Sequence, residues 1–147
     1  MRSGGVSALM SCVLAWLLPG AGHFYLGKRR RAAVFFCVVL ATFLLGVLNG
    51  GHAYLADPQQ PLTYLGTLAN IAVGPLEFFS RRATYHRLVY ALPPDENSPE
   101  AEVLLTAMRD KVRIVTDEYG TTYLLTAGLM NMLLILDAFD IAVGRKA

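Results

Sequence analysis

The chain has 147 residues, of which 54% are apolar and 16% are charged, against roughly 25% charged residues in an average soluble domain. The 13 Lys and Arg residues nearly balance the 11 Asp and Glu residues. Without a basic excess to bind a phosphate backbone, nucleic acid is excluded as a partner. The composition predicts an all-α, polytopic membrane helical bundle that forms a single membrane domain over residues 1–147.

Four apolar segments predict about four transmembrane helices, because a spanning helix needs about 20 mostly apolar residues. Pro19 and Gly20 interrupt the first segment, for which a signal peptide is the alternative, and Pro75 removes a helical hydrogen bond from the third. The second segment has no charged residue and is the clearest span. The predicted spans are 6–26, 32–48, 62–79 and 121–143.

The distribution of Lys and Arg predicts the orientation of these spans. Four crossings place ten basic residues on one side and three on the other, so we expect the basic loops in the cytoplasm and both termini outside the cytoplasmic membrane. The loop 80–120 is then cytoplasmic, and the apolar spacing over 101–115 predicts one interfacial amphipathic helix in it. If segment 62–79 only enters the membrane and returns, the balance becomes six against seven and favours neither side.

The most specific motif begins at Pro19 and ends in the basic run Lys28, Arg29, Arg30 and Arg31. It resembles the family of two transmembrane helices joined by a G-x-x-G-x-H-R-F-Y-L-G linker, although the arginine between His and Phe is missing here. The matching residues are Gly20, Gly22, His23, Phe24, Tyr25, Leu26 and Gly27. The last predicted span is similar to the closing segment of an uncharacterised bacterial group of small polytopic membrane proteins that carry this linker. These resemblances imply membrane residence and no catalytic residue.

Small and amide residues on two predicted spans form faces suited to close helix packing in lipid. Gly66, Asn70 and Gly74 recur every four residues, and Gly128 and Asn131 share one side of the last span. These faces suit contacts within the chain or with larger integral membrane subunits. With no enzyme motif present, we expect a non-enzymatic accessory or structural subunit of a larger membrane complex, with an energy-converting complex, respiratory or photosynthetic, as the host.

An intramembrane acid supports a second hypothesis, because an acid within a span is costly unless it is paired, neutral or in contact with water. Asp137 and Asp140 lie in the last span, and Asp137 is the candidate centre of a small transporter or proton-handling protein. The structural alternative is that both acids mark the outer interface beside Arg145 and Lys146.

A third hypothesis is a haem or chlorophyll pigment bound by His23, since neutral imidazole is a common ligand. No histidine pair has the spacing of a helical metal site, so no metal site is predicted. Membrane lipids are expected partners of Lys28, Arg29, Arg30, Arg31, Arg81 and Arg82 through their headgroups. Glu77 precedes Arg81 by four residues, which predicts a local ion pair.

Overall fold

The computed structural model describes residues 3–93, 95, 97–112 and 117–146. Arg2 and Arg113, which enter the charge balance above, lie outside these residues. The described residues form α-helices and no strand, which confirms the predicted all-α class. The helices are α1 (Ser3–Leu17), α2 (Ala21–Tyr25), α3 (Arg29–Leu48), α4 (Leu62–Ala72), α5 (Leu76–Tyr85), α6 (Pro99–Val112) and α7 (Asp117–Ala142).

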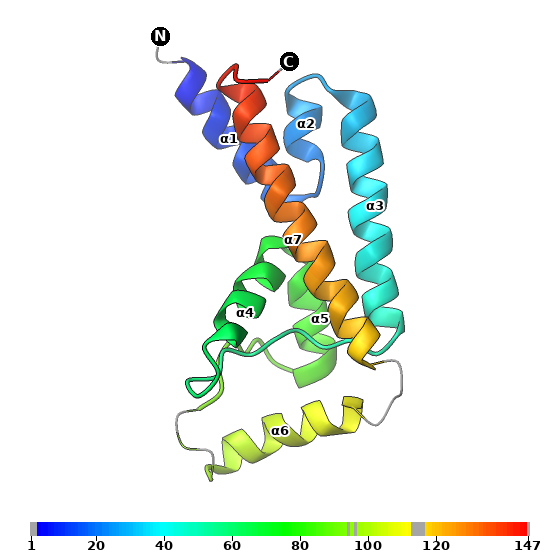
Figure 1. Ribbon diagram of the computed structural model, residues 1–147, viewed down its shortest axis with the longest axis vertical. Coiled ribbons are helices and arrows are strands. Elements are labelled where there is room, and N and C mark those ends of the chain that lie inside the picture. The colour runs from blue at the N-terminus through cyan, green and yellow to red at the C-terminus, as the bar shows by residue number, and fades with distance from the viewer. Residues whose placement is uncertain (1–2, 94, 96, 113–116, 147) are drawn as a thin grey trace.

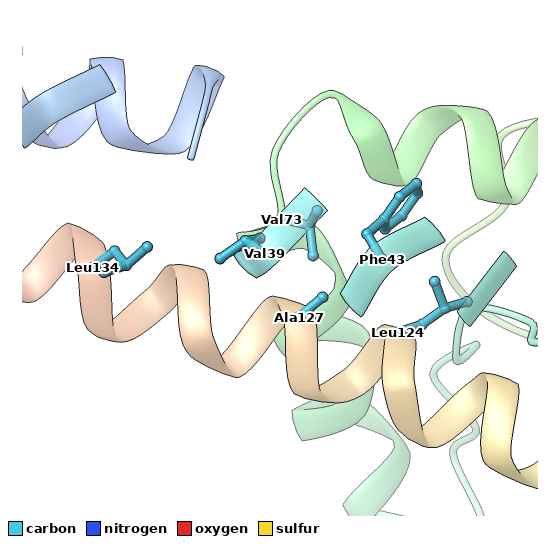
Figure 2. Packing of buried hydrophobic residues seen from close by; sticks show 6 residues of the cluster. All are labelled: Val39, Phe43, Val73, Leu124, Ala127 and Leu134. Atoms are coloured by element: carbon cyan, nitrogen blue, oxygen red, sulfur yellow. The ribbon is translucent and has the colours of Figure 1, made fainter. Parts of the chain in front are cut away.

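Two long helices, α3 and α7, lie side by side and run in opposite directions (Figure 1). Within the described residues, only Arg29–Leu48 and Glu118–Ala142, with 20 and 25 residues, are long and apolar enough to cross a membrane. The main apolar core lies between these helices and the second hairpin (Figure 2). Its buried members are Val39, Phe43, Val73, Leu124, Ala127 and Leu134.

Glycines bring the end of α3 against the start of α7. A Cβ atom at Gly51 would overlap the backbone of Gly120, and one at Gly120 would lie 2.8 Å from the Gly46 carbonyl oxygen. Because these backbones touch directly, the two long helices are held together at the end of the molecule opposite the chain termini (Figure 1).

The first hairpin consists of α1 and the shorter α2, joined by a turn at Pro19 and Gly20 (Figure 1). Gly20 has a φ of 83°, a left-handed conformation that reverses the chain at low cost only for glycine. A Cβ atom at Gly22 would overlap the Ser11 carbonyl oxygen, so α2 packs directly on α1. The predicted span over 6–26 is therefore two helices, and both outer ends lie at the end of the molecule that holds the termini (Figure 1).

The second hairpin consists of α4 and α5, joined by a turn at Val73, Gly74 and Pro75. Gly74 has a φ of 82°, and Pro75 has no backbone N–H to continue the hydrogen bonds of α4. The segment 62–79 was predicted to cross as one interrupted span. This is corrected, because the chain reverses at Gly74 and α5 returns to the end of the molecule where α4 began (Figure 1).

The predicted helix is present over 101–112 as part of α6, and its residues 113–115 lie outside the described residues. Helix α6 lies across the end of the molecule beyond α5 (Figure 1). Its start is capped by Ser98, whose Oγ accepts a hydrogen bond from the Ala101 N–H at 3.2 Å. Leu104 packs in a second apolar cluster with Leu55 and Tyr85, which joins α6 to α5 and to the extended segment 52–56.

Candidate functional site

The two hairpins share a short sequence pattern although they enter the molecule from opposite ends. Residues 14–25 read L-A-W-L-L-P-G-A-G-H-F-Y and residues 68–79 read L-A-N-I-A-V-G-P-L-E-F-F, with four identical positions at a constant offset of 54. The turn glycines Gly20 and Gly74 are one of these pairs. The first hairpin is followed directly by the long helix α3, and the second is followed by α6 and then by the long helix α7. The helices α3 and α7 run in opposite directions (Figure 1). The fold thus contains an inverted repeat of hairpin and long helix.

Equivalent residues of the two hairpins are also buried or exposed alike. The residue three positions after each turn glycine is ionisable and buried: His23 is 0% exposed and Glu77 is 1% exposed. The next two residues in each hairpin, 24–25 and 78–79, are aromatic and exposed. Each hairpin therefore directs one ionisable side chain into the protein and two aromatic side chains outward.

His23 pairs with Asp137 of α7. Its Nε2 atom lies 2.9 Å from Asp137 Oδ2, while Lys146 Nζ donates to Asp137 Oδ1 at 2.7 Å. Asp137 is 25% exposed, so the pair connects a water-accessible carboxylate to a fully buried imidazole. The hydrogen bond to Asp137 raises the pKa of the Lys146 ammonium above its ordinary value. The imidazole also packs against the edge of Phe35, with ring centroids 4.9 Å apart.

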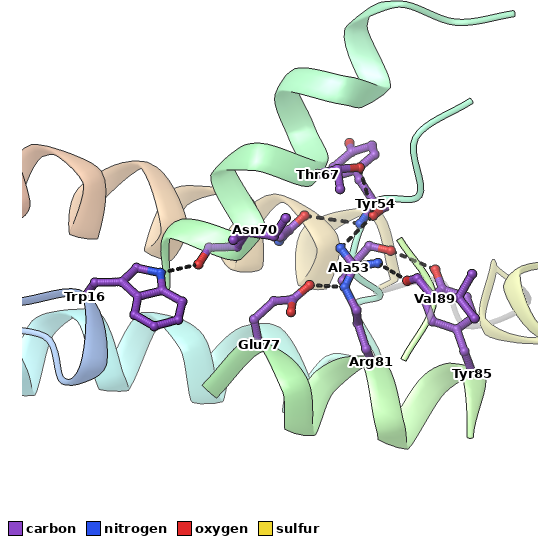
Figure 3. Close-up of polar contacts among 10 residues, drawn as sticks. Trp16, Ala53, Tyr54, Thr67, Asn70, Glu77, Arg81, Tyr85 and Val89 are labelled. Carbon is purple, nitrogen blue, oxygen red and sulfur yellow. Dashed lines mark hydrogen bonds and ion pairs between the residues drawn. The ribbon is translucent and has the colours of Figure 1, made fainter. Parts of the chain in front are cut away.

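Glu77 pairs with Arg81 on the same helix, as predicted, and Figure 3 shows the surrounding contacts. Arg81 donates from Nε to Glu77 and from its two terminal nitrogens to the carbonyl oxygens of Val89, at 2.5 Å, and Tyr54, at 3.0 Å. Its guanidinium also lies over the ring of Tyr90 at 4.4 Å. Arg81 is 0% exposed, so the predicted contact with lipid headgroups is wrong for this residue. Its charge is satisfied by buried acceptors instead.

The tips of the hairpins meet near the middle of α7. Trp16 Nε1 donates to the Ile71 carbonyl oxygen at 2.9 Å, which joins the end of α1 to the end of α4 (Figure 3). Asn131 of α7 is fully buried, and its Nδ2 donates to the carbonyl oxygens of Ala15 at 3.2 Å and Ala72 at 2.7 Å. The last carbonyls of a helix have no partner within it and carry partial negative charge, so these donors satisfy both helix ends together.

The residues predicted to pack helices all lie at contacts within the chain. Besides Asn131, Gly66 faces the ring of Tyr54, and Asn70 Oδ1 accepts a hydrogen bond from the Tyr54 N–H at 3.1 Å. A Cβ atom at Gly74 would overlap the Trp16 carbonyl oxygen, and one at Gly128 would overlap that of Ala69. These faces are therefore buried at contacts within the chain.

The remaining predicted residues lie apart from the tips. Asp140 contacts Arg145 at 3.5 Å, and the exposed Arg82 lies on α5. In the basic run, Lys28 precedes α3 and Arg29–Arg31 form its first turn. No group of three or more His, Cys, Asp or Glu side chains that could hold a metal ion occurs in the part of the chain that the structure describes.

Three features were missed from the sequence: the repeat itself, the buried position of Glu77, and the role of Trp16 at the hairpin tips. The signal for the repeat was present, because a comparison at an offset of 54 residues pairs Gly20 with Gly74 and His23 with Glu77. Nothing in the local sequence marks Trp16, whose partner Ile71 lies 55 residues away.

Together these features define an all-helical protein with two helices that are long and apolar enough to span a membrane. The chain belongs to a family of unknown function, DUF6677, whose model matches residues 10–147. No curated protein and no solved structure matches the chain. The resemblance to the two-helix family with the glycine-rich linker stays a prediction.

Proposed function

We propose that this is an integral membrane protein in which α3 and α7 cross the bilayer and the two hairpins enter from opposite sides without crossing. At 1.5 Å per residue, the 20 residues of α3 cover about 30 Å, the thickness of the hydrocarbon core. The 11 residues of α4 cover only about 16 Å. This arrangement replaces the four full spans expected from the sequence. Because the third segment returns, the balance of basic residues favours neither orientation.

Exposed apolar side chains support this placement. They occur on the long helices and on the hairpins alike, with Leu48 80%, Leu65 65% and Leu133 65% exposed. A soluble chain would leave this apolar surface in water at a large cost, whereas a bilayer covers it.

Given this placement in the membrane, we propose that the protein is a small proton-handling transporter. The observation that carries the proposal is the inverted repeat, which places a buried ionisable residue, His23 or Glu77, at the same position of two hairpins that enter from opposite ends. Many transporters are built from inverted repeats whose discontinuous helices meet near the bilayer midplane. Ionisable side chains inside a membrane protein are costly and are characteristic of proton relays.

Four buried polar atoms without a hydrogen-bond partner support the same function. Within the described residues these atoms belong to His23 in the first hairpin, to Asn131 beside the tips, and to Glu77 and Ser80 in the second hairpin. Buried polar atoms are nearly always hydrogen-bonded to protein or to water, so we expect water to reach these four atoms. We propose that these groups, together with the water-accessible Asp137, exchange protons in the interior.

The experiment is a proton-flux measurement on the full chain in liposomes containing a pH-sensitive dye, driven by a potassium diffusion potential. Wild type should exceed protein-free liposomes, and Asp137→Asn should lower the flux at least tenfold because it removes the charge paired with His23. Asp140→Asn is the matched control, since Asp140 contacts Arg145 and lies three residues along the same helix. Circular dichroism and size-exclusion chromatography establish that each variant folds.

No flux above protein-free liposomes would refute the proposal, as would equal losses in the two Asn variants. Stoichiometric co-purification of larger subunits together with absent flux would instead support the accessory role. A pigment on His23 is not proposed, because the imidazole is enclosed and its Nε2 is already bonded to Asp137.

A further inference from the structure

An apolar groove of about 360 Å³ lies between the turn of the first hairpin and the first half of α3. It is open along one side and contains a single charged lining residue, Arg29, at the start of α3. The apolar lining comes mainly from Leu18, Pro19, Ala21, Ala32, Ala33 and Phe36. The groove thus extends from the hairpin turn, deep in the molecule, toward the end where the basic run lies.

A second hollow adjoins the groove at Arg29. It has a volume of about 320 Å³ and is lined by Gly27 and the basic run Lys28–Arg31. The Arg29 guanidinium also lies 5.8 Å from the ring centroid of Phe24, which lines the apolar groove. Arg29 therefore borders both the apolar groove and the hollow beside the basic run.

We propose that this pair of hollows binds one anionic phospholipid, with an acyl chain in the apolar groove and the phosphate against Arg29 and the adjoining basic residues. Phe36 lies seven residues beyond Arg29, about 10 Å along α3, so the groove follows an acyl chain from the headgroup region toward the bilayer centre. We expect the lipid to be anionic, because a negatively charged headgroup is attracted to a basic cluster at the membrane surface. The inference depends on the membrane placement proposed above and not on proton movement.

The test is native mass spectrometry of the detergent-purified full chain with equimolar phosphatidylglycerol and phosphatidylcholine. Wild type should retain one phosphatidylglycerol in preference to phosphatidylcholine. Ala33→Phe fills the groove from an exposed position and should lower retention at least tenfold, whereas Ala41→Phe, also exposed on α3 but outside the groove, should not. Arg29→Gln should abolish the preference, and Arg82→Gln, an exposed arginine on α5, should preserve it.

Equal retention of the two lipids by wild type would overturn the proposal, and so would full retention by Ala33→Phe. Displacement of the lipid by millimolar inorganic phosphate would show a site for free phosphate. A change in oligomeric mass without a change in lipid retention would show a contact between two copies of the chain. Selective lipid retention with absent flux would refute only the proposed transport, which keeps the two failures distinct.

Discussion

Replacement of Gly74 by alanine tests the contact between the hairpin tips. A left-handed conformation costs an L-residue about 1–2 kcal/mol, and Gly74 has a φ of 82°. The added Cβ atom would also overlap the Trp16 carbonyl oxygen. Relief of this overlap separates the tips and weakens the 2.9 Å hydrogen bond from Trp16 to Ile71, a bond of a kind that contributes roughly 0.5–1.5 kcal/mol. We expect the free energy of unfolding to fall by about 2–3 kcal/mol.

Gly27→Ala is the matched control. Gly27 has a φ of 77°, but no atom lies within 4 Å of the position of its Cβ, so this variant bears only the backbone cost of about 1–2 kcal/mol. The difference between the two variants isolates the tip contact. Unfolding is followed by circular dichroism during SDS titration of the protein in mixed micelles.

Tryptophan fluorescence provides an independent readout, because Trp16 is the single tryptophan of the chain and lies at the contact. Its emission should shift in Gly74→Ala and stay unchanged in Gly27→Ala. Equal destabilisation of both variants, with unchanged emission, would refute the contact between the tips.

Three further predictions concern the buried charges and the membrane. Arg81→Met leaves the Glu77 carboxylate buried without its partner and should lower stability by about 3–5 kcal/mol, whereas Arg82→Met at an exposed position should change it little; the same SDS titration measures both. Leu133→Lys places a charge on the exposed face of α7 and should oppose insertion by about 2.5–3.5 kcal/mol, and unchanged recovery in the membrane fraction would contradict a spanning α7. Asp137→Asn should speed amide hydrogen exchange in α2 but not in α5, measured by mass spectrometry, and equal acceleration in both would contradict a local link.

The two long helices were predictable from composition alone. The predicted spans 32–48 and 121–143 correspond to α3 (Arg29–Leu48) and α7 (Asp117–Ala142), because a long apolar run favours one continuous helix in either case. The differences lie at the ends, where charged residues continue the helix beyond its apolar part. Arg29–Arg31 form the first turn of α3 although they contribute nothing to the apolar pattern.

The hairpins were not predictable in the same way. A glycine beside a proline in an apolar run is compatible with a kinked span or with a reversal of the chain. The choice depends on the φ of one residue, Gly74, and on its contact with Trp16, 58 residues earlier in the sequence. A local pattern contains no information about such a contact.

The candidate site was predictable in part. Asp137 stands out because an acid in an apolar helix needs a partner, and the sequence offered Lys146 nearby. The second partner, His23, lies 114 residues away and is brought to Asp137 only by the packing of the first hairpin on α7. The spacing of Glu77 and Arg81 predicts their local ion pair but does not show that Glu77 occupies the same position in its hairpin as His23.

The two halves of the repeat differ in how their ionisable residues are held. His23 is bonded to Asp137 on another helix, so a change of protonation at this pair alters the link between α2 and α7. Glu77 is bonded to Arg81 one turn away on its own helix, and Arg81 also binds carbonyl oxygens that do not titrate. Loss of a proton or a charge therefore weakens a contact between helices in the first half and mainly a contact within one helix in the second. A change at the His23–Asp137 pair therefore acts on the packing of α2 against α7, whereas a change at the Glu77–Arg81 pair acts mainly within α5.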